Sequence, residues 1–307
     1  MAVVGVDIGG SHITCGIIGD RGTLRSGTLL NHKTLGKEGK DLIHAWGMAI
    51  REVLESSSED IVSGIGIAIP GPMDYQRGVA FFDGSNSKFR SLYQVDIRQD
   101  LEKALQFQGE IRFVNDAIAF GIGESWVGEG QGMTSSLALT LGTGFGSVLF
   151  KNDRPLLKGD SVPKNGCFWH LPFREGIADD YFSTRWLVNR YNELKGTNAI
   201  GVKEIADVFD SCVFAKQVFE EFGEMLGSFL HPWIMALALE GIIIGGNISR
   251  ALRCFEPALM DGFQRKGLNP IIKESKLLES AALVGSARIH QEDYWNSLNK
   301  QIGGLIF

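Results

Sequence analysis

A pattern of strand, glycine turn and strand occurs twice in this chain and constrains its fold more than any other feature. Residues 3–18 (VVGVDIGGSHITCGII) and 135–150 (SSLALTLGTGFGSVLF) each place apolar runs on both sides of a short glycine turn. Such runs predict two strands joined by a tight turn, in which Gly9 and Gly10 can take the positive φ that a hairpin needs. Aligning Gly9 with Gly142 gives an offset of 142 − 9 = 133 residues and places Thr140 where Asp7 stood. The sequence therefore predicts two similar halves.

Strands and helices alternate along the rest of the chain. Helical patterns cover residues 40–60, 95–107, 116–128 and 213–239. Strand patterns cover residues 61–70, 111–114 and 241–247. This alternation is typical of an α/β fold, and 307 residues exceed the size at which single cores stop growing. We therefore expect two α/β halves whose glycine turns face a shared cleft.

The charge and the cysteines exclude several classes of function. The 36 acidic residues outnumber the 30 basic ones, the formal charge is -6, and no block of like charges occurs. Nucleic acid is therefore disfavoured as the main partner. The four cysteines lie far apart without C-x-x-C spacing, as in a reduced cytosolic protein, so we expect no disulfides.

Neither secretion nor membrane insertion is expected. The N-terminus has no basic region and Asp7 interrupts its first apolar run, so no secretory signal is predicted and the expected location is the cytoplasm. The most membrane-like window, residues 226–244, contains His231, Pro232 and Glu240. A charge near the centre of a span costs roughly 2.5 kcal/mol or more. A buried helix followed by a buried strand explains this window better.

Three glycine turns, in residues 9–11, 142–146 and 245–247, follow predicted strands. Such turns bring bare backbone N–H groups close to a ligand and favour anions such as phosphate. The chain has no G-x-x-x-x-G-K-[ST], and its turns do not match G-x-G-x-x-G followed by a helix, which argues against a P-loop and a Rossmann dinucleotide site. Topology alone explains any one turn equally well, but their repetition favours anion binding.

Six ordered motifs resemble the bacterial ROK family (repressors, open reading frames and sugar kinases), in particular its glucokinase-like members. The motifs are VDIGGSHI, AIPGPMD, VNDAIAFGIGE, LTLGTGFGS, IIIGGNIS and AALVGSA. The resemblance implies an α/β, two-domain actin-like ATPase (ribonuclease H-like) fold with the active site in the interdomain cleft. We expect an N-terminal domain over residues 1–117 and a C-terminal domain over residues 118–290, with a C-terminal helix at about residues 291–307 packing back on the first.

The cofactors that this resemblance implies are ATP and Mg²⁺. Asp7 would lie near the Mg–ATP phosphates and hold the metal through water. Backbone donors plus a metal supply the positioning and charge neutralisation that phosphoryl transfer needs. The implied nucleotide-binding residues are Gly9, Gly10 and Ser11 in the first phosphate turn, Gly142, Thr143, Gly144 and Gly146 in the second, and Gly245, Gly246 and Asn247 beside the adenosine.

Asn115 and Asp116 lie between a predicted strand and a predicted helix. Both residue types are favoured N-caps, and loss of a cap typically costs about 1 kcal/mol. The alternative follows from their position, because ligands bind beyond the carboxyl ends of parallel strands. By resemblance, Asp116 would be the general base that accepts the proton of a sugar hydroxyl, and Asn115 would bind the sugar. Gly71, in the turn after residues 61–70, is also expected at the sugar.

The sequence departs from the family in one segment, NGCFWHLPFREGIADDYFS. Family kinases carry Glu-Ile-Gly-His, a cysteine-rich zinc loop and a further glutamate. Here His170 matches the histidine, Cys167 replaces the first glutamate, and the zinc cysteines are absent, so we expect no structural zinc. Asp179 falls where the second glutamate belongs, one methylene shorter, so its sugar contact is weakened. His170 is either a sugar ligand or a residue packed beside Trp169.

These residues predict an ATP-dependent kinase of a hexose or N-acetylhexosamine, with glucose as the default substrate. Asn86 is a further candidate sugar ligand, although an ordinary polar turn also explains it. The alternative function is a catalytically silent sugar-binding sensor, which the missing glutamate favours and the retained Asp7 and Asp116 disfavour. A ROK-type repressor is not expected, because the first phosphate turn begins within ten residues of Met1. Family precedent suggests a homodimer whose only other partner is the small-molecule sugar.

Overall fold

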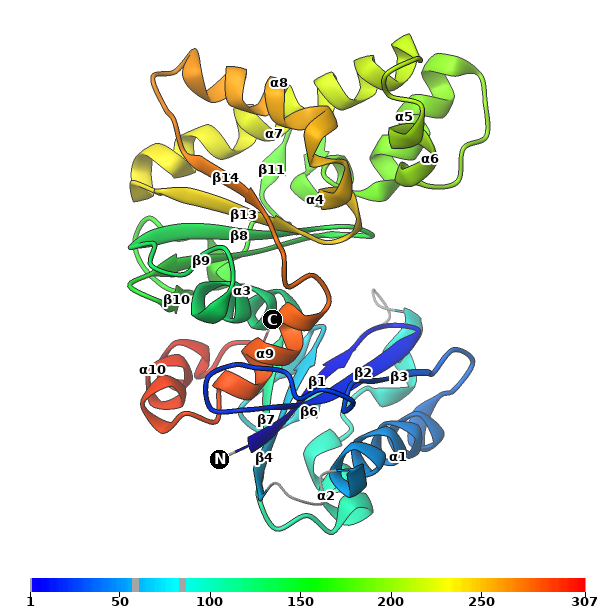
Figure 1. Cartoon of the computed structure of the whole chain (residues 1–307), viewed down its shortest axis with the longest axis vertical. Coiled ribbons are helices and arrows are strands. Elements are labelled where there is room, and N and C mark those ends of the chain that lie inside the picture. The colour runs from blue at the N-terminus through cyan, green and yellow to red at the C-terminus, as the bar shows by residue number, and fades with distance from the viewer. Residues whose placement is uncertain (1, 57–60, 83–86, 307) are drawn as a thin grey trace. The chain divides into compact units, whose positions relative to one another are not determined.

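The computed structural model describes residues 2–56, 61–82 and 87–306. The chain divides into two compact units, one formed by Met1–Gly128 with Glu279–Phe307 and the other by Glu129–Leu278. Each unit contains one five-stranded sheet with helices packed against it (Figure 1).

The sheet of the first unit has the strand order β3-β2-β1-β4-β7. β1 pairs antiparallel with β2, and β2 with β3, whereas β1, β4 and β7 run parallel. Its strands are β1 (Ala2–Ile8), β2 (His12–Ile18), β3 (Leu30–Lys33), β4 (Val62–Ile69) and β7 (Glu110–Asn115), with a small pair β5 (Met73–Asp74) and β6 (Val79–Ala80). The predicted first hairpin and the strands at residues 61–70 and 111–114 are confirmed.

The helices of this unit bury apolar side chains against the sheet or against one another. They are α1 (Gly39–Ser56), α2 (Ile97–Leu105), α3 (Asp116–Val127), α9 (Ser280–Arg288) and α10 (Glu292–Ile302), with a short 3₁₀ helix η1 (Ser87–Leu92). Figure 1 shows α1 and α2 on one side of the sheet and α9 on the other. The helical spacing in α1 buries Trp46, Ile50 and Val53 completely.

Glycines allow α9 to lie unusually close to its neighbours. A Cβ on Gly66 of β4 would lie 1.8 Å from the carbonyl oxygen of Ser286, and one on Gly285 would lie 1.8 Å from that of Ala119 in α3. The backbone N–H of Val6 also donates to the Ser286 hydroxyl at 3.2 Å. Only glycine fits at these two positions, so Gly66 and Gly285 are what allow α9 to pack directly against β4 and α3.

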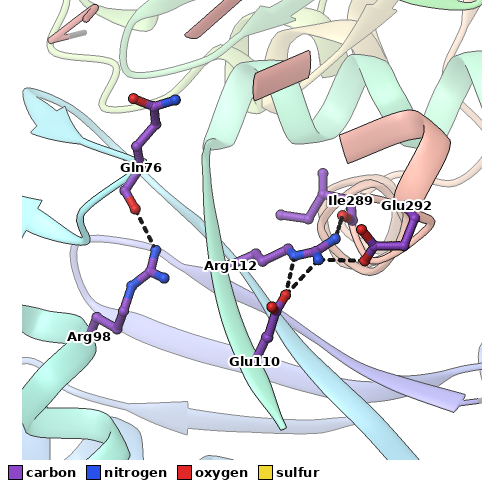
Figure 2. A network of polar contacts seen from close by, with 6 residues as sticks. All are labelled: Gln76, Arg98, Glu110, Arg112, Ile289 and Glu292. Atoms are coloured by element: carbon purple, nitrogen blue, oxygen red, sulfur yellow. Dashed lines mark hydrogen bonds and ion pairs between the residues drawn. The ribbon is translucent and has the colours of Figure 1, made fainter. Parts of the chain in front are cut away.

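The C-terminal helix α10 also belongs to the first unit. Figure 2 shows Arg112 of β7 at the centre of the polar contacts that join the two elements. Arg112 is 5% exposed, and its guanidinium donates to the carboxylates of Glu110 and Glu292 and, at 2.8 Å, to the carbonyl of Ile289. Because all these groups satisfy the buried cation, they fix the start of α10 against β7.

The second unit repeats the sheet topology of the first, with the order β10-β9-β8-β13-β14. β8 pairs antiparallel with β9, β9 with β10, and β8, β13 and β14 run parallel. Its strands are β8 (Ser135–Leu141), β9 (Phe145–Lys151), β10 (Arg154–Leu156), β13 (Gly241–Gly245) and β14 (Ile271–Glu274), with a small pair β11 (Pro172–Phe173) and β12 (Gly176–Ile177). The repeat predicted from the glycine turns is confirmed.

The long helix of the second unit explains the apolar window. α7 (Val213–Leu237) continues through Pro232 and buries Leu226 and Leu230, and β13 buries Ile242 to Ile244. None of the described helices combines the length and apolar composition that a membrane span requires. The other helices are α4 (Ala178–Tyr181), α5 (Thr184–Lys195), α6 (Val202–Asp207) and α8 (Leu252–Gln264), with 3₁₀ helices η2 (Lys164–Gly166) and η3 (Asn247–Ala251).

The division between the units differs from the expected boundaries. The expected domains meet at residues 117 and 118, inside α3, whereas the first unit continues to Gly128. Residues 279–290 also group with the first unit instead of the second. The physical reason is the close contact among α3, α9 and the first sheet, since Gly123 and Gly285 let the two helix backbones touch.

Candidate active site

The carboxyl edge of the first sheet carries the candidate catalytic residues. In the strand register, Asp7 of β1 pairs with Ala68 of β4, and Ile69 pairs with Asn115 of β7. Asp7 and Asn115 therefore lie at the same edge, two strand spacings or roughly 10 Å apart. Gly71 follows β4 at this edge, and its peptide bond to Pro72 is cis.

Asn115 caps α3, and Asp116 is the first residue of that helix. The Asn115 side-chain oxygen accepts hydrogen bonds from the N–H groups of Ala117 at 3.0 Å and Ile118 at 3.3 Å, and its amide nitrogen donates to the Tyr75 hydroxyl. Asp116 Oδ1 accepts a hydrogen bond from the Ala117 N–H at 2.9 Å. Asn115 thus caps α3, and its role as a sugar ligand stays a prediction, while one carboxylate oxygen of Asp116 has no part in these contacts.

The electrostatic surroundings of this edge favour protonated carboxyls. Burial raises the pKa of Asp116, and the backbone of Ala117 opposes this only in part. Burial, and then the negative charges of Asp116 and Glu279, raise the pKa of Asp7 to about 7. Two carboxyls with raised pKa values at one sheet edge are typical of a functional site.

A divalent cation fits the position of Asp7. In the described part of the chain, no group of three or more His, Cys, Asp or Glu side chains could hold a metal ion. Mg²⁺ does not require such a group, because it keeps several waters and binds through one or two carboxylates together with substrate phosphates. Its charge would also relieve the repulsion that Asp116 and Glu279 exert on Asp7.

The first glycine turn joins β1 to β2 at the same edge. The Gly9 N–H donates to the His12 carbonyl at 2.9 Å, and the Ser11 hydroxyl lies 3.2 Å from His12 Nδ1. The expected positive φ was wrong, since neither Gly9 nor Gly10 is among the described glycines with positive φ. Residues 9–12 form a four-residue connection between the paired Ile8 and Ile13, and such loops mostly use a type I turn with negative φ.

The two glycine turns of the second unit meet each other. A Cβ on Gly142 would lie 4.0 Å from the Asn247 N–H nitrogen, and one on Gly246 would lie 2.4 Å from the Leu141 carbonyl oxygen. Gly246 has a φ of 82°, which L residues with side chains rarely adopt. Thr143, Gly246 and Asn247 are exposed, whereas Gly245 is buried. The structure thus brings the second phosphate turn and the expected adenosine residues together.

Asp179 of α4 contacts the turn at residues 142–146. The Phe145 N–H donates to Asp179 Oδ1 at 2.7 Å, and a Cβ on Gly144 would lie 3.0 Å from the same oxygen. The Asp179 N–H donates to the Trp169 carbonyl at 3.0 Å. The Thr184 N–H donates to the Gly142 carbonyl at 2.7 Å, so α4 and α5 both contact this turn.

Cys167 and His170 form the remaining candidate pair. The Cys167 sulfur lies 3.8 Å from His170 Nδ1, and the Trp169 ring meets the His170 ring edge-to-face at 5.3 Å. Burial raises the pKa of Cys167 to about 11, so the thiol is neutral at pH 7, and burial also lowers the pKa of His170. A neutral thiol therefore stands where the family has a carboxylate. Contact with Trp169 agrees with the packed alternative for His170 and leaves its role as a sugar ligand a prediction.

The comparisons with known proteins assign the chain to a family. The model of the ROK family matches residues 3–293. The chain belongs to the ROK family. It is 27% identical to a glucokinase of Thermotoga maritima, covering 95% of this chain and 98% of that protein. It is also 27% identical to an N-acetyl-D-glucosamine kinase of Mannheimia succiniciproducens, over 93% of this chain and 98% of the relative.

A solved ROK structure confirms the predicted fold. A ROK family glucokinase from Streptomyces griseus, in complex with glucose and AMPPNP, superposes with a TM-score of 0.74 at 21% identity, covering 94% of this chain and 99% of that one. The fold of this ROK protein is therefore the α/β actin-like ATPase fold, and both the family and the fold class predicted from the motifs are confirmed.

Three residues of this ROK protein were missed from sequence. Tyr75 donates to the Ile69 carbonyl and accepts from Asn115, Glu279 acts on Asp7 through space, and His12 contacts the first turn. Only Glu279 carries a local signal, an acidic residue just before the apolar AALVGSA helix. Asn86 lies outside the described residues, so its assignment stays a prediction.

Proposed function

We propose that this ROK protein transfers the γ-phosphate of ATP to a hydroxyl of a hexose or an N-acetylhexosamine, with Asp116 as general base. The observation that carries the proposal is that Asp7 and Asp116 both lie at one edge of the sheet and both have raised pKa values. The relatives named glucokinase and N-acetyl-D-glucosamine kinase support the class of enzyme predicted, an ATP-dependent sugar kinase. They do not favour the sensor alternative.

In this proposal Asp116 accepts the proton of the attacking hydroxyl. A carboxylate whose pKa is raised by burial is a stronger base than an exposed one, and general-base catalysis of this kind contributes about 10² to 10⁴ in rate. The Ala117 N–H fixes Oδ1, so the carboxylate has a defined orientation at the start of α3. Asn115, held in turn by Tyr75, would position the sugar beside it.

The remaining residues would hold the nucleotide. Mg²⁺, when bound, neutralises phosphate charge, and Asp7 would hold it through water. The turns at residues 9–11 and 142–146 would donate backbone N–H groups to the phosphates, and residues 245–247 would flank the adenosine. His170 and Gly71 are the other candidate sugar residues, whereas the hydrogen bond that Asp179 accepts from the Phe145 N–H favours a different role for Asp179. A homodimer and a cytoplasmic location remain predictions.

The test of this proposal is a coupled ADP-release assay over glucose, other hexoses and N-acetylhexosamines. Asp116→Asn is expected to lower kcat by about 10² to 10⁴ while sugar and nucleotide binding remain, because Asn keeps a side-chain oxygen for the Ala117 N–H but cannot accept the proton.

Asp96→Asn is the matched control. Asp96 is an exposed N-cap of α2 whose carboxylate accepts a hydrogen bond from the Gln99 N–H at 2.9 Å, so this variant makes the same chemical change at the start of a helix without touching the proposed site. Turnover by Asp116→Asn at the wild-type rate would refute the base role. Sugar binding by calorimetry without turnover on any acceptor would instead establish the sensor.

A further inference from the structure

The Asp179 carboxylate, expected from the family resemblance to bind the sugar, is hydrogen-bonded to the protein backbone. Its Oδ1 accepts the Phe145 N–H at 2.7 Å, a short charge-assisted hydrogen bond to the first residue of β9, which lies within the second glycine turn. The same oxygen lies 3.0 Å from where a Cβ on Gly144 would stand, so a side chain at residue 144 would push the carboxylate away by a few tenths of an ångström. The side chain is thus committed to the turn by both a hydrogen bond and close packing.

The whole turn is held at its two ends. The Gly142 N–H donates to the Gly144 carbonyl at 3.1 Å, and the Gly142 carbonyl accepts the Thr184 N–H. At the other end the Phe145 N–H is bound by Asp179. Within the described ranges, the N–H groups of Thr143 and Gly144 have no protein acceptor, so these two donors are the ones left for an anion.

We infer that Asp179 is a positioning residue for the second phosphate turn, and that it acts on nucleotide binding rather than on the sugar. The inference rests on the proposed kinase function, because it takes the turn at residues 142–146 as a phosphate site. By holding the Phe145 N–H, Asp179 fixes the backbone that carries the Thr143 and Gly144 donors. A backbone fixed before binding does not lose conformational entropy when the phosphate arrives.

The charge of Asp179 gives this role a distinctive signature. A carboxylate beside a phosphate turn repels the ligand, whereas an amide oxygen at the same place accepts the same hydrogen bond without that repulsion. Asp179→Asn should therefore bind nucleotide as tightly as the wild type or more tightly. Asp179→Ala should bind it about tenfold more weakly, because the loss of one hydrogen bond to a charged group leaves the turn unheld. A sugar ligand would behave differently, since both variants would weaken sugar binding.

The experiment measures the Kd of Mg–AMPPNP by calorimetry on the full chain without sugar, and the KM of ATP and of the best sugar in the ADP-release assay. Asp180→Ala is the matched control, because Asp180 is the next residue of α4 and accepts the Ile177 N–H at 3.1 Å, outside the phosphate turn. Thermal unfolding of each variant separates a local loss from a loss of fold.

The expected result is a tenfold higher nucleotide Kd and ATP KM for Asp179→Ala alone, with recovery in Asp179→Asn, an unchanged sugar KM and no effect of Asp180→Ala. A rise of the sugar KM in both Asp179 variants, with nucleotide Kd unchanged, would overturn the inference and restore the sugar role. Equal nucleotide Kd values in all variants, or no nucleotide binding by the wild type, would also overturn it. Because calorimetry needs no turnover, absence of activity on every sugar would count against the proposed function and not against this inference.

Discussion

Replacing His290 should change how the stability of the protein depends on pH. His290 follows α9, and its ring contacts β4 so closely that a Cβ on Gly64 would lie 2.3 Å from Nδ1. Its Nε2 is buried without a hydrogen-bond partner among the described residues. Burial, and to a smaller degree Arg112, lower the pKa of His290 to about 4, against a hydrogen bond to the Ile65 backbone and the charges of Glu110 and Glu292.

The sign of the effect follows from proton binding. Below pH 6.5 the unfolded chain protonates this histidine, whereas the folded chain keeps it neutral until about pH 4. The unfolded state therefore binds more protons in this window, and folding stability falls as the pH falls through it. Each pKa unit is worth about 1.4 kcal/mol, so the full effect is roughly 3 kcal/mol, of which about 2.5 kcal/mol is present at pH 4.5.

The assay is urea unfolding, followed by tryptophan fluorescence, at pH 7.5 and at pH 4.5. His290→Gln cannot gain this proton, so its free energy of unfolding should fall by about 2.5 kcal/mol less than that of the wild type between the two pH values. His44→Gln is the control, because His44 is exposed on α1. Other groups such as Asp7 cancel in the comparison of variants. Parallel curves for the wild type and His290→Gln would refute a neutral, buried histidine.

Two further predictions concern packing and catalysis. Gly66→Ala should destabilise the first unit by about 3 kcal/mol or more in urea unfolding, because the new Cβ would overlap the Ser286 carbonyl. The control Gly201→Ala places its Cβ in open space and should cost under about 1 kcal/mol. Equal costs for the two variants would contradict the close packing of α9. As the pH is lowered, the kcat/KM of the wild type should decrease with an apparent pKa above about 4, the ordinary pKa of an aspartate, because burial raises the pKa of Asp116 and the base must be ionised. An apparent pKa at or below about 4 on the acid side of the profile would contradict this.

The elements of this fold were predictable because their periodicities are local. The spacing of Leu42, Trp46 and Val53 defines α1, and the two apolar runs around residues 9–11 define the β1-β2 hairpin. The carboxyl-edge placement of Asp116 also followed from sequence, since a strand and a helix flank it. The backbone dihedrals of the first turn could not be predicted in this way. They depend on the length of the connection, which the pairing of Ile8 with Ile13 sets at four residues.

The contacts that the sequence could not predict join distant residues. The hydrogen bond from Val6 to Ser286 spans 280 residues, and nothing local to the AALVGSA motif says that its glycine faces α3. The placement of α9 with the first unit depends on such contacts. Asp179 is a similar case, because matching it to a family glutamate gives its position in the chain and not its partner. The bond to the Phe145 N–H depends on how α4 packs against the second turn.

The repeated topology places residues of different chemistry at equivalent positions of the two sheets. Asp7 and Thr140 occupy the same position in equivalent sheets, since each lies on the strand before its glycine turn. Asp7 pairs with Ala68 of β4, and Thr140 pairs with Gly245 of β13. Both turns can offer backbone N–H groups to phosphates, but only the first strand carries a carboxylate. A carboxylate at residue 140 would repel a phosphate at the second turn, because Coulomb repulsion is stronger where water is partly excluded. In the second unit, by contrast, Thr140 adds no charge beside its turn, where the carboxylate of Asp179 already accepts the Phe145 N–H.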